Sequence, residues 1–199
     1  MAKAAFKPQR TMWSKLFTYD YWMESTGIPI HRGFYIEDLR TLQLGWWEER
    51  QCHSAFIQLA GQEGVSSARV TEIPAGDKLP PLKFALDEVV YVASGRGLTS
   101  IWYDNRPARK SFEWQEHSLF MIPHGCTHQF SNMQGDKPAR LLHYSYLPLA
   151  LSAVPDPDYF FNNPHAATDD LADEGAFFSE AKLVTQAASS NPWGRTAYW

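Results

Sequence analysis

The chain has 199 residues, of which 44% are hydrophobic and 15% aromatic, enough for one domain with a filled core. Its net charge is −4, and it has neither a basic block nor a long apolar run, which excludes a typical nucleic-acid-binding surface and a membrane-spanning helix. The N-terminal residues lack the apolar stretch of a secretory signal, and two distant cysteines, Cys52 and Cys126, make no disulfide scaffold, so we expect a cytoplasmic protein.

The first element is a short helix in an N-terminal arm that we assign to residues 1–28. Large apolar residues recur at roughly helical spacing within residues 11–25, namely Trp13, Leu16, Phe17, Tyr21 and Trp22. Thr11 can cap this helix and Gly27 can end it. The pattern predicts a short amphipathic helix.

Residues 29–154 carry the signals of short strands separated by turns. The predicted strands are 30–35, 46–49, 52–59, 68–73, 88–93, 98–103, 111–114, 118–122, 128–130 and 140–146. A turn at residues 94–97 joins two of them. Because no helical pattern intervenes, this region predicts an all-β sandwich or barrel rather than a parallel sheet.

Residues 155–199 form a C-terminal arm with few strand signals and one candidate helix within residues 169–187. The arm is rich in aromatic residues: Tyr159, Phe160, Phe161, Phe177, Phe178, Trp193, Tyr198 and Trp199. Disordered segments are poor in aromatics. We therefore expect the arm to pack on the barrel or on a second subunit.

Two spaced patterns between residues 74 and 132 resemble the motifs of the cupin superfamily. The first motif is G-x(5)-H-x-H-x(3,4)-E-x(6)-G. Gly76, Glu88 and Gly95 stand at its glycine and glutamate positions, whereas Leu82 and Phe84 occupy its two histidine positions. The spacing of the motif is kept, but both of its histidine ligands are missing.

The second motif of the superfamily is G-x(5)-P-x-G-x(2)-H-x(3)-N. Pro123, Gly125, His128 and Asn132 match it in register, and His117 replaces its first glycine. The resemblance covers about 60 residues and implies a cupin double-stranded β-helix, an all-β jelly-roll barrel around a small-molecule pocket. It also implies a homodimer, because cupins commonly pair.

Metal-binding cupins hold Fe, Mn, Ni, Cu or Zn with three histidines and one glutamate. Leu82 and Phe84 cannot act as ligands, so only Glu88 and His128 remain, and His143 on the following strand is a candidate third ligand. One hypothesis is a rebuilt site of these three residues with one divalent Fe, Mn, Zn or Ni ion. The other is no metal, with Glu88 and His128 as a general acid–base pair in an apolar pocket.

The predicted wall of the pocket combines residues of both motifs with their neighbours: Leu82, Phe84, Tyr103, Phe130, Asn132 and His143. His128, Phe130 and Asn132 alternate along one strand, which places them on one face. The resemblance implies an isomerase, lyase, decarboxylase or dioxygenase acting on a small organic acid, ketone or aromatic metabolite. A non-catalytic binding or sensing protein and the metal-free half of a two-domain cupin stay open as alternatives.

Overall fold

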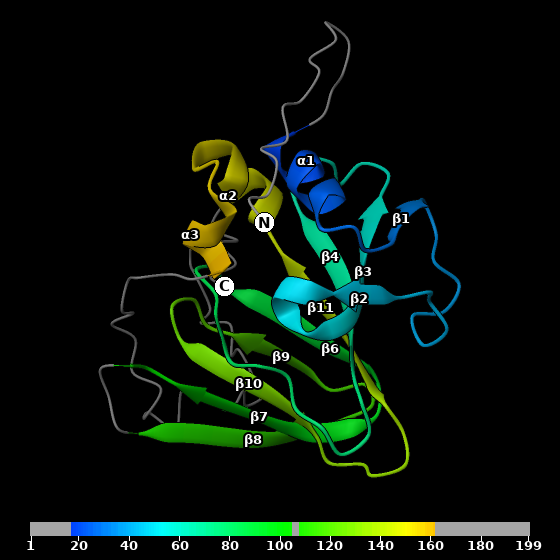
Figure 1. Cartoon of the computed structure of the whole chain (residues 1–199), viewed down its shortest axis with the longest axis vertical. Helices are drawn as coiled ribbons and strands as arrows, with labels where there is room; N and C mark the ends of the chain where they lie inside the picture. Colours follow the sequence, from blue (N-terminus) through cyan, green and yellow to red (C-terminus); the bar gives the residue numbers. More distant parts are fainter. Residues whose placement is uncertain (1–16, 105–107, 162–199) are drawn as a thin grey trace, which may run out of the picture. The chain divides into compact units, whose positions relative to one another are not determined.

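The computed structural model describes residues 17–104 and 108–161, which belong to one compact unit (Figure 1). Thr11, the proposed helix cap, and most of the C-terminal arm lie outside the described residues. Within the described part, no helix is long and apolar enough to cross a membrane.

Strands dominate the described residues, and the α-helices lie before and after them, whereas one short 3-10 helix lies between two strands. The elements are α1 (Thr18–Ser25), β1 (Ile30–Gly33), β2 (Gly45–Trp47), the 3-10 helix η1 (Glu48–Arg50), β3 (Cys52–Leu59), β4 (Ser67–Ile73), β5 (Leu82–Lys83), β6 (Glu88–Ser94), β7 (Arg96–Trp102), β8 (Arg109–Gln115), β9 (Leu119–Ile122), β10 (Thr127–Asn132), β11 (Ala139–Ser145), α2 (Leu147–Ala153) and α3 (Pro157–Phe161). Each strand expected from the sequence is present, and the two-residue β5 is additional.

Eight of these strands, β4 to β11, have the connectivity of a jelly roll. One sheet contains the order β4-β11-β6-β9 and the other the order β5-β10-β7-β8. The first of the eight strands therefore pairs with the last, the second with the seventh, the third with the sixth and the fourth with the fifth. β3 and β1 extend the first sheet, β2 pairs with β3, and the two sheets remain separate hydrogen-bonded units. The prediction of an all-β jelly roll is confirmed.

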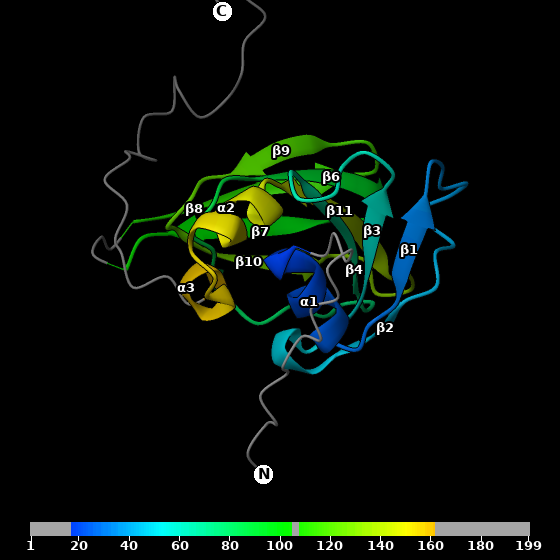
Figure 2. The ribbon, with the colours of Figure 1, turned by 90° about the horizontal axis from the view of Figure 1, so that it is seen from above.

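The three α-helices lie together at one end of the two sheets (Figure 2). Tyr19 and Met23 of α1, Leu151 of α2 and Phe160 of α3 share a buried cluster with Phe56 of β3. Large apolar side chains from sequence-distant helices therefore cover this end of the barrel. α3, at the described start of the C-terminal arm, contributes Phe160 to this cluster, and the packing of the arm as a whole stays a prediction.

The turn between β6 and β7 depends on a glycine of the first cupin-like motif. Gly95 has φ +96°, and an added Cβ would lie 2.6 Å from Ala139 Cβ and 2.7 Å from Ala139 Cα. We expect Gly95→Ala to lower the free energy of unfolding by about 1–3 kcal/mol more than Gly61→Ala. Gly61 is a matched control, because it has φ +97° but no heavy atom within 4 Å of an added Cβ. Urea denaturation measures both, and equal losses would show that Ala139 yields to the methyl group.

Candidate active site

A fully buried carboxylate lies at the centre of the barrel. Glu88, the first residue of β6, is 0% exposed. Its Oε1 lies 2.9 Å from Nη2 of Arg69, and its Oε2 is 2.8 Å from Nδ1 of His143. A buried charge is strongly unfavourable unless it is paired and hydrogen-bonded. These two contacts therefore account for an ionised carboxylate in the interior.

The register of the first sheet brings these three side chains together. Arg69 of β4 lies directly opposite His143 of β11, and His143 lies opposite Val90 of β6. Glu88 is two residues before Val90 and therefore shares its face, because side chains alternate along a strand. Three strands that are neighbours in the sheet, but distant in the sequence, thus build one polar cluster.

The second sheet contributes another buried histidine. His128 of β10 is 1% exposed, and the Phe130 ring centroid lies 5.1 Å from that of His128 and 5.6 Å from that of His143. Among the described residues, no group hydrogen-bonds either ring nitrogen of His128 or Nε2 of His143. Such unpartnered buried nitrogens indicate a position for a polar ligand.

A cavity of about 30 Å³ lies between the sheets. Its polar lining includes Arg50, Arg69, Thr71, His128 and His143. A water molecule needs roughly 10–15 Å³ of such volume, so the cavity accommodates about two waters or a polar group of a few heavy atoms. It therefore fits the head group of a ligand better than a whole large metabolite.

Burial and pairing set the charges around the cavity. Burial alone would raise the pKa of Glu88, but the Arg69 guanidinium and the His143 hydrogen bond lower this pKa to about 2. Burial lowers the pKa of His128 to about 3, although Glu88 opposes the shift, and it lowers the pKa of His143 for the same reason. At neutral pH Glu88 is therefore an anion and both histidines are neutral.

The carboxylate also selects the tautomer of His143. Because Glu88 Oε2 accepts a hydrogen bond from Nδ1 at 2.8 Å, neutral His143 carries its proton on Nδ1. The lone pair on Nε2 is then available in the cavity. This arrangement allows His143 to accept a proton while Glu88 stabilises the resulting imidazolium.

The described residues do not form a ready metal site around Glu88, His128 and His143. Oε2 of Glu88 accepts from Nδ1 of His143 and from Nη2 of Arg69, and the same guanidinium lies 2.9 Å from Oε1. Across residues 17–104 and 108–161, no group of three or more His, Cys, Asp or Glu side chains is arranged to hold a metal ion. In this arrangement Arg69 supplies the positive charge beside Glu88, and the rebuilt Fe, Mn, Zn or Ni site stays a prediction.

The structure divides the predicted pocket residues into two groups. Leu82 and Phe130 line the cavity with His128 and His143. Phe84 does not line the cavity: it belongs, with Leu82, to the cluster at the barrel end, and its ring centroid lies 5.2 Å from that of Phe161. Tyr103 is buried outside the cavity lining. Leu82 and Glu88 lie on strands of different sheets rather than on one regular strand.

Asn132 stabilises a loop junction rather than lining the cavity. Its side-chain amide nitrogen donates to the carbonyl oxygens of Ile73, Pro74 and Lys137, and its Oδ1 accepts from the backbone N–H of Gln134. All four hydrogen bonds of the Asn132 side chain are therefore to backbone atoms. They fasten the end of β4 to the loop between β10 and β11, which corrects the expectation that Asn132 faces a ligand.

Comparisons with known proteins give matches among solved structures alone. No family model and no curated protein matches the chain. It is similar to oxalate decarboxylase from Lactobacillus farciminis in a formate complex, with 17% identity, a TM-score of 0.45 and coverage of 54% of this chain and 32% of that chain. It is also similar to vicilin from Capsicum annuum, with 17% identity, a TM-score of 0.42 and coverage of 52% and 28%, respectively.

A third similar structure is oxalate decarboxylase from Bacillus subtilis at pH 4.6, with 14% identity and a TM-score of 0.40. That match covers 49% of this chain and 25% of the other. The chain thus spans about a third or less of each of these three proteins. With its jelly-roll strand order, and with Glu88 and His128 on facing sheets at the positions of the two motifs, the chain has the cupin fold.

Proposed function

We propose that the chain is a cupin-fold enzyme of the isomerase or lyase class, in which His143 transfers protons to and from a small carbonyl compound. The observation that carries this proposal is the 2.8 Å hydrogen bond between Glu88 and His143 Nδ1, with Nε2 unpartnered beside the cavity. The sequence alone assigned the catalytic roles to Glu88 and His128. The geometry instead supports His143 as the base and Glu88 as its positioning residue.

The proposed step begins with Nε2 of His143 as a base. Its lone pair accepts a proton from the carbon next to a carbonyl group, and the electron pair of that C–H bond moves into an enolate. Glu88 stabilises the imidazolium that forms. The imidazolium then returns the proton to a different carbon in an isomerisation, or the enolate expels a leaving group in an elimination. Arg69 keeps Glu88 ionised, so that the carboxylate orients His143 and does not compete for the proton.

Solvent deuterium exchange tests this step without knowledge of the natural substrate. The protein is incubated in D₂O with small 2-oxo acids, 3-oxo acids and ketones, and loss of the α-proton signals is followed by ¹H NMR. We expect exchange in the wild type and a decrease of about 100-fold or more in His143→Asn, because a positioned general base contributes about 10²–10⁴-fold. The Asn amide nitrogen preserves a donor toward Glu88, which limits structural effects.

The matched control is His53→Asn, since His53 is exposed on β3 and is not among the residues that line the cavity. Exchange should be unchanged in this variant. Deuterium exchange at the wild-type rate in His143→Asn would contradict the proposal. So would binding of oxo acids by the wild type without exchange, which would identify a binding or sensing protein instead.

That the chain forms a homodimer stays a prediction, and so does the alternative that it is the metal-free half of a two-domain cupin. Both cysteines, Cys52 and Cys126, are free and buried, which is compatible with the proposed cytoplasmic setting. We propose that the active unit needs no residue from a second subunit, because Glu88, Arg69, His128 and His143 come from one chain.

A further inference from the structure

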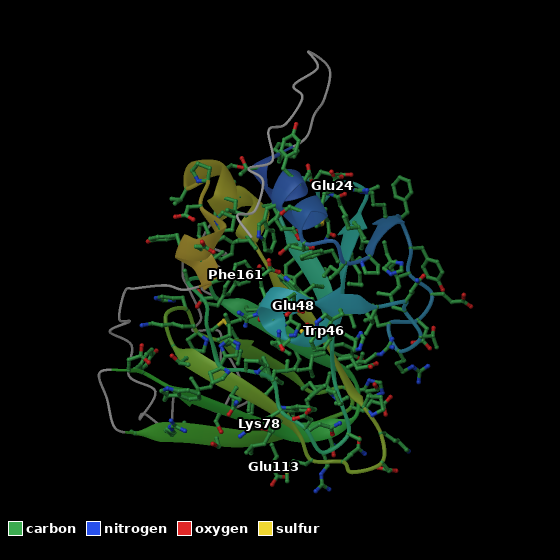
Figure 3. The ribbon with its side chains drawn as sticks, viewed as in Figure 1. Glu24, Trp46, Glu48, Lys78, Glu113 and Phe161 are labelled. Atoms are coloured by element: carbon green, nitrogen blue, oxygen red, sulfur yellow. The ribbon has the colours of Figure 1, made fainter. Side chains whose placement is uncertain are left out.

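One cation in the cavity wall has no role in the proton-transfer step. Arg50 is the last residue of η1, and Gln51 after it has φ +51°, so the chain turns sharply into β3. The guanidinium carbon of Arg50 lies 5.9 Å from the centroid of the Phe161 ring. Figure 3 shows Phe161 on α3 near the segment that carries Glu48.

Arg50 lines the same cavity as Arg69, His128 and His143. Unlike Arg69, Arg50 has no carboxylate within ion-pair distance among the residues that the structure describes. Burial lowers the pKa of Arg50 to about 10, which still leaves it protonated at neutral pH. The cavity wall thus contains one guanidinium that is paired and one that is not.

The charges around the cavity sum to one excess positive charge. Glu88 neutralises Arg69, both histidines are neutral, and burial raises the pKa of the Cys52 thiol to about 11, so that it also is uncharged. Arg50 contributes the remaining charge. Arg50 is partly exposed at the cavity wall, and a ligand with a single negative charge would supply the anionic partner that its guanidinium lacks there.

We infer that the cavity recognises its substrate through a carboxylate group and that Arg50 is the residue that determines this specificity. The inference rests on the proposed function and names its substrate class as small oxo acids. A guanidinium presents two parallel N–H donors that match the two oxygens of a carboxylate. The volume of about 30 Å³ suits such a planar head group. Phosphate is bulkier, and a second negative charge would exceed the one free positive charge.

Acetate and acetamide test the inference directly, because they have the same shape and differ in charge. Binding is measured by ligand-observed NMR titration at neutral pH, with inorganic phosphate as a third probe. We expect acetate to bind at least 10-fold more tightly than either acetamide or phosphate. Arg50→Met should lose at least 10-fold in acetate affinity, and its acetamide affinity should not change. The acetate affinity of Arg50→Lys should lie between those of the wild type and Arg50→Met, because a lysine is a point charge.

Arg96→Met is the matched control, since Arg96 is exposed at the start of β7. Its acetate affinity should equal that of the wild type, and urea denaturation establishes that each variant is folded. Equal affinities for acetate and acetamide would overturn the inference. Full acetate affinity in Arg50→Met, or preference for phosphate, would overturn it as well.

The two proposals fail in distinguishable ways. Arg50-dependent acetate binding without deuterium exchange on any oxo acid would retain carboxylate recognition and reject proton transfer by His143. Exchange on neutral ketones that is insensitive to Arg50→Met but abolished by His143→Asn would retain the proposed function and reject the role of Arg50.

Discussion

Glu88→Gln is expected to lower the free energy of unfolding by about 3–5 kcal/mol, the loss typical of removing one partner of a buried ion pair. The substitution keeps the shape of the side chain and removes its charge. Arg69, whose side chain is 11% exposed, would then remain as an uncompensated cation between the sheets. Urea denaturation at pH 7 measures the loss.

A second substitution distinguishes the charge effect from poor packing. In Glu88→Gln/Arg69→Met both charges are absent, and replacing a buried pair by uncharged groups of similar volume is often close to neutral. We therefore expect the double variant to be more stable than Glu88→Gln alone. A loss below about 1 kcal/mol in the single variant, or a double variant that is less stable still, would contradict the pairing seen here.

Acidification is expected to destabilise the fold from pH 6.5 downward, by about 2–5 kcal/mol between pH 6.5 and pH 4.5. Unfolded histidines take up a proton near pH 6.5, whereas burial lowers the pKa of folded His128 to about 3 and also lowers that of His143. Well above pH 6.5 these two histidines are neutral in both states and contribute no pH dependence. As the pH falls, the unfolded state binds more protons, so the free energy of unfolding decreases.

Glu88 extends the same trend to lower pH. Its pKa is near 4.5 when unfolded and about 2 when folded, so its stabilisation is present above pH 4.5 and is lost as the pH falls toward 2. Urea denaturation at a series of pH values measures the profile. His128→Leu should reduce the slope between pH 6.5 and pH 4.5 by roughly half, and His53→Gln on the outer face should not. A flat profile in the wild type would show that the histidines are not buried as neutral groups.

Most of the fold could be predicted from the sequence because strand alternation and turn residues are local signals. The strand at 52–59 was predicted with its observed ends, and Glu88 was predicted as the first residue of its strand. β5 was not predicted, because Leu82–Lys83 is too short to show alternation and is defined by its pairing with β10. Pairing between distant segments is a property of the folded chain alone.

The site was less predictable, because its decisive residue follows a misleading pattern. In β4, apolar Ala68 and Val70 flank Arg69, which is the alternation expected when Arg69 faces solvent. The sheet is covered on both faces, however. Ala68 and Val70 pack under a cluster that includes Ile36, Leu39, Leu42 and Leu44, and Arg69 points inward to Glu88. Arg50 lies in a short 3-10 turn, where no periodicity marks the inward side.

The pairing of the first jelly-roll strand with the last has a consequence for synthesis. Ser67 of β4 and Ser145 of β11 are hydrogen-bonded across a separation of 78 residues. At translation rates of about 5–20 residues per second, one edge of β4 waits on the order of 4–16 s for its partner to leave the ribosome. Contacts of such long range also slow folding after release. During that interval the nascent chain displays an open strand edge, which makes it a candidate client for chaperones.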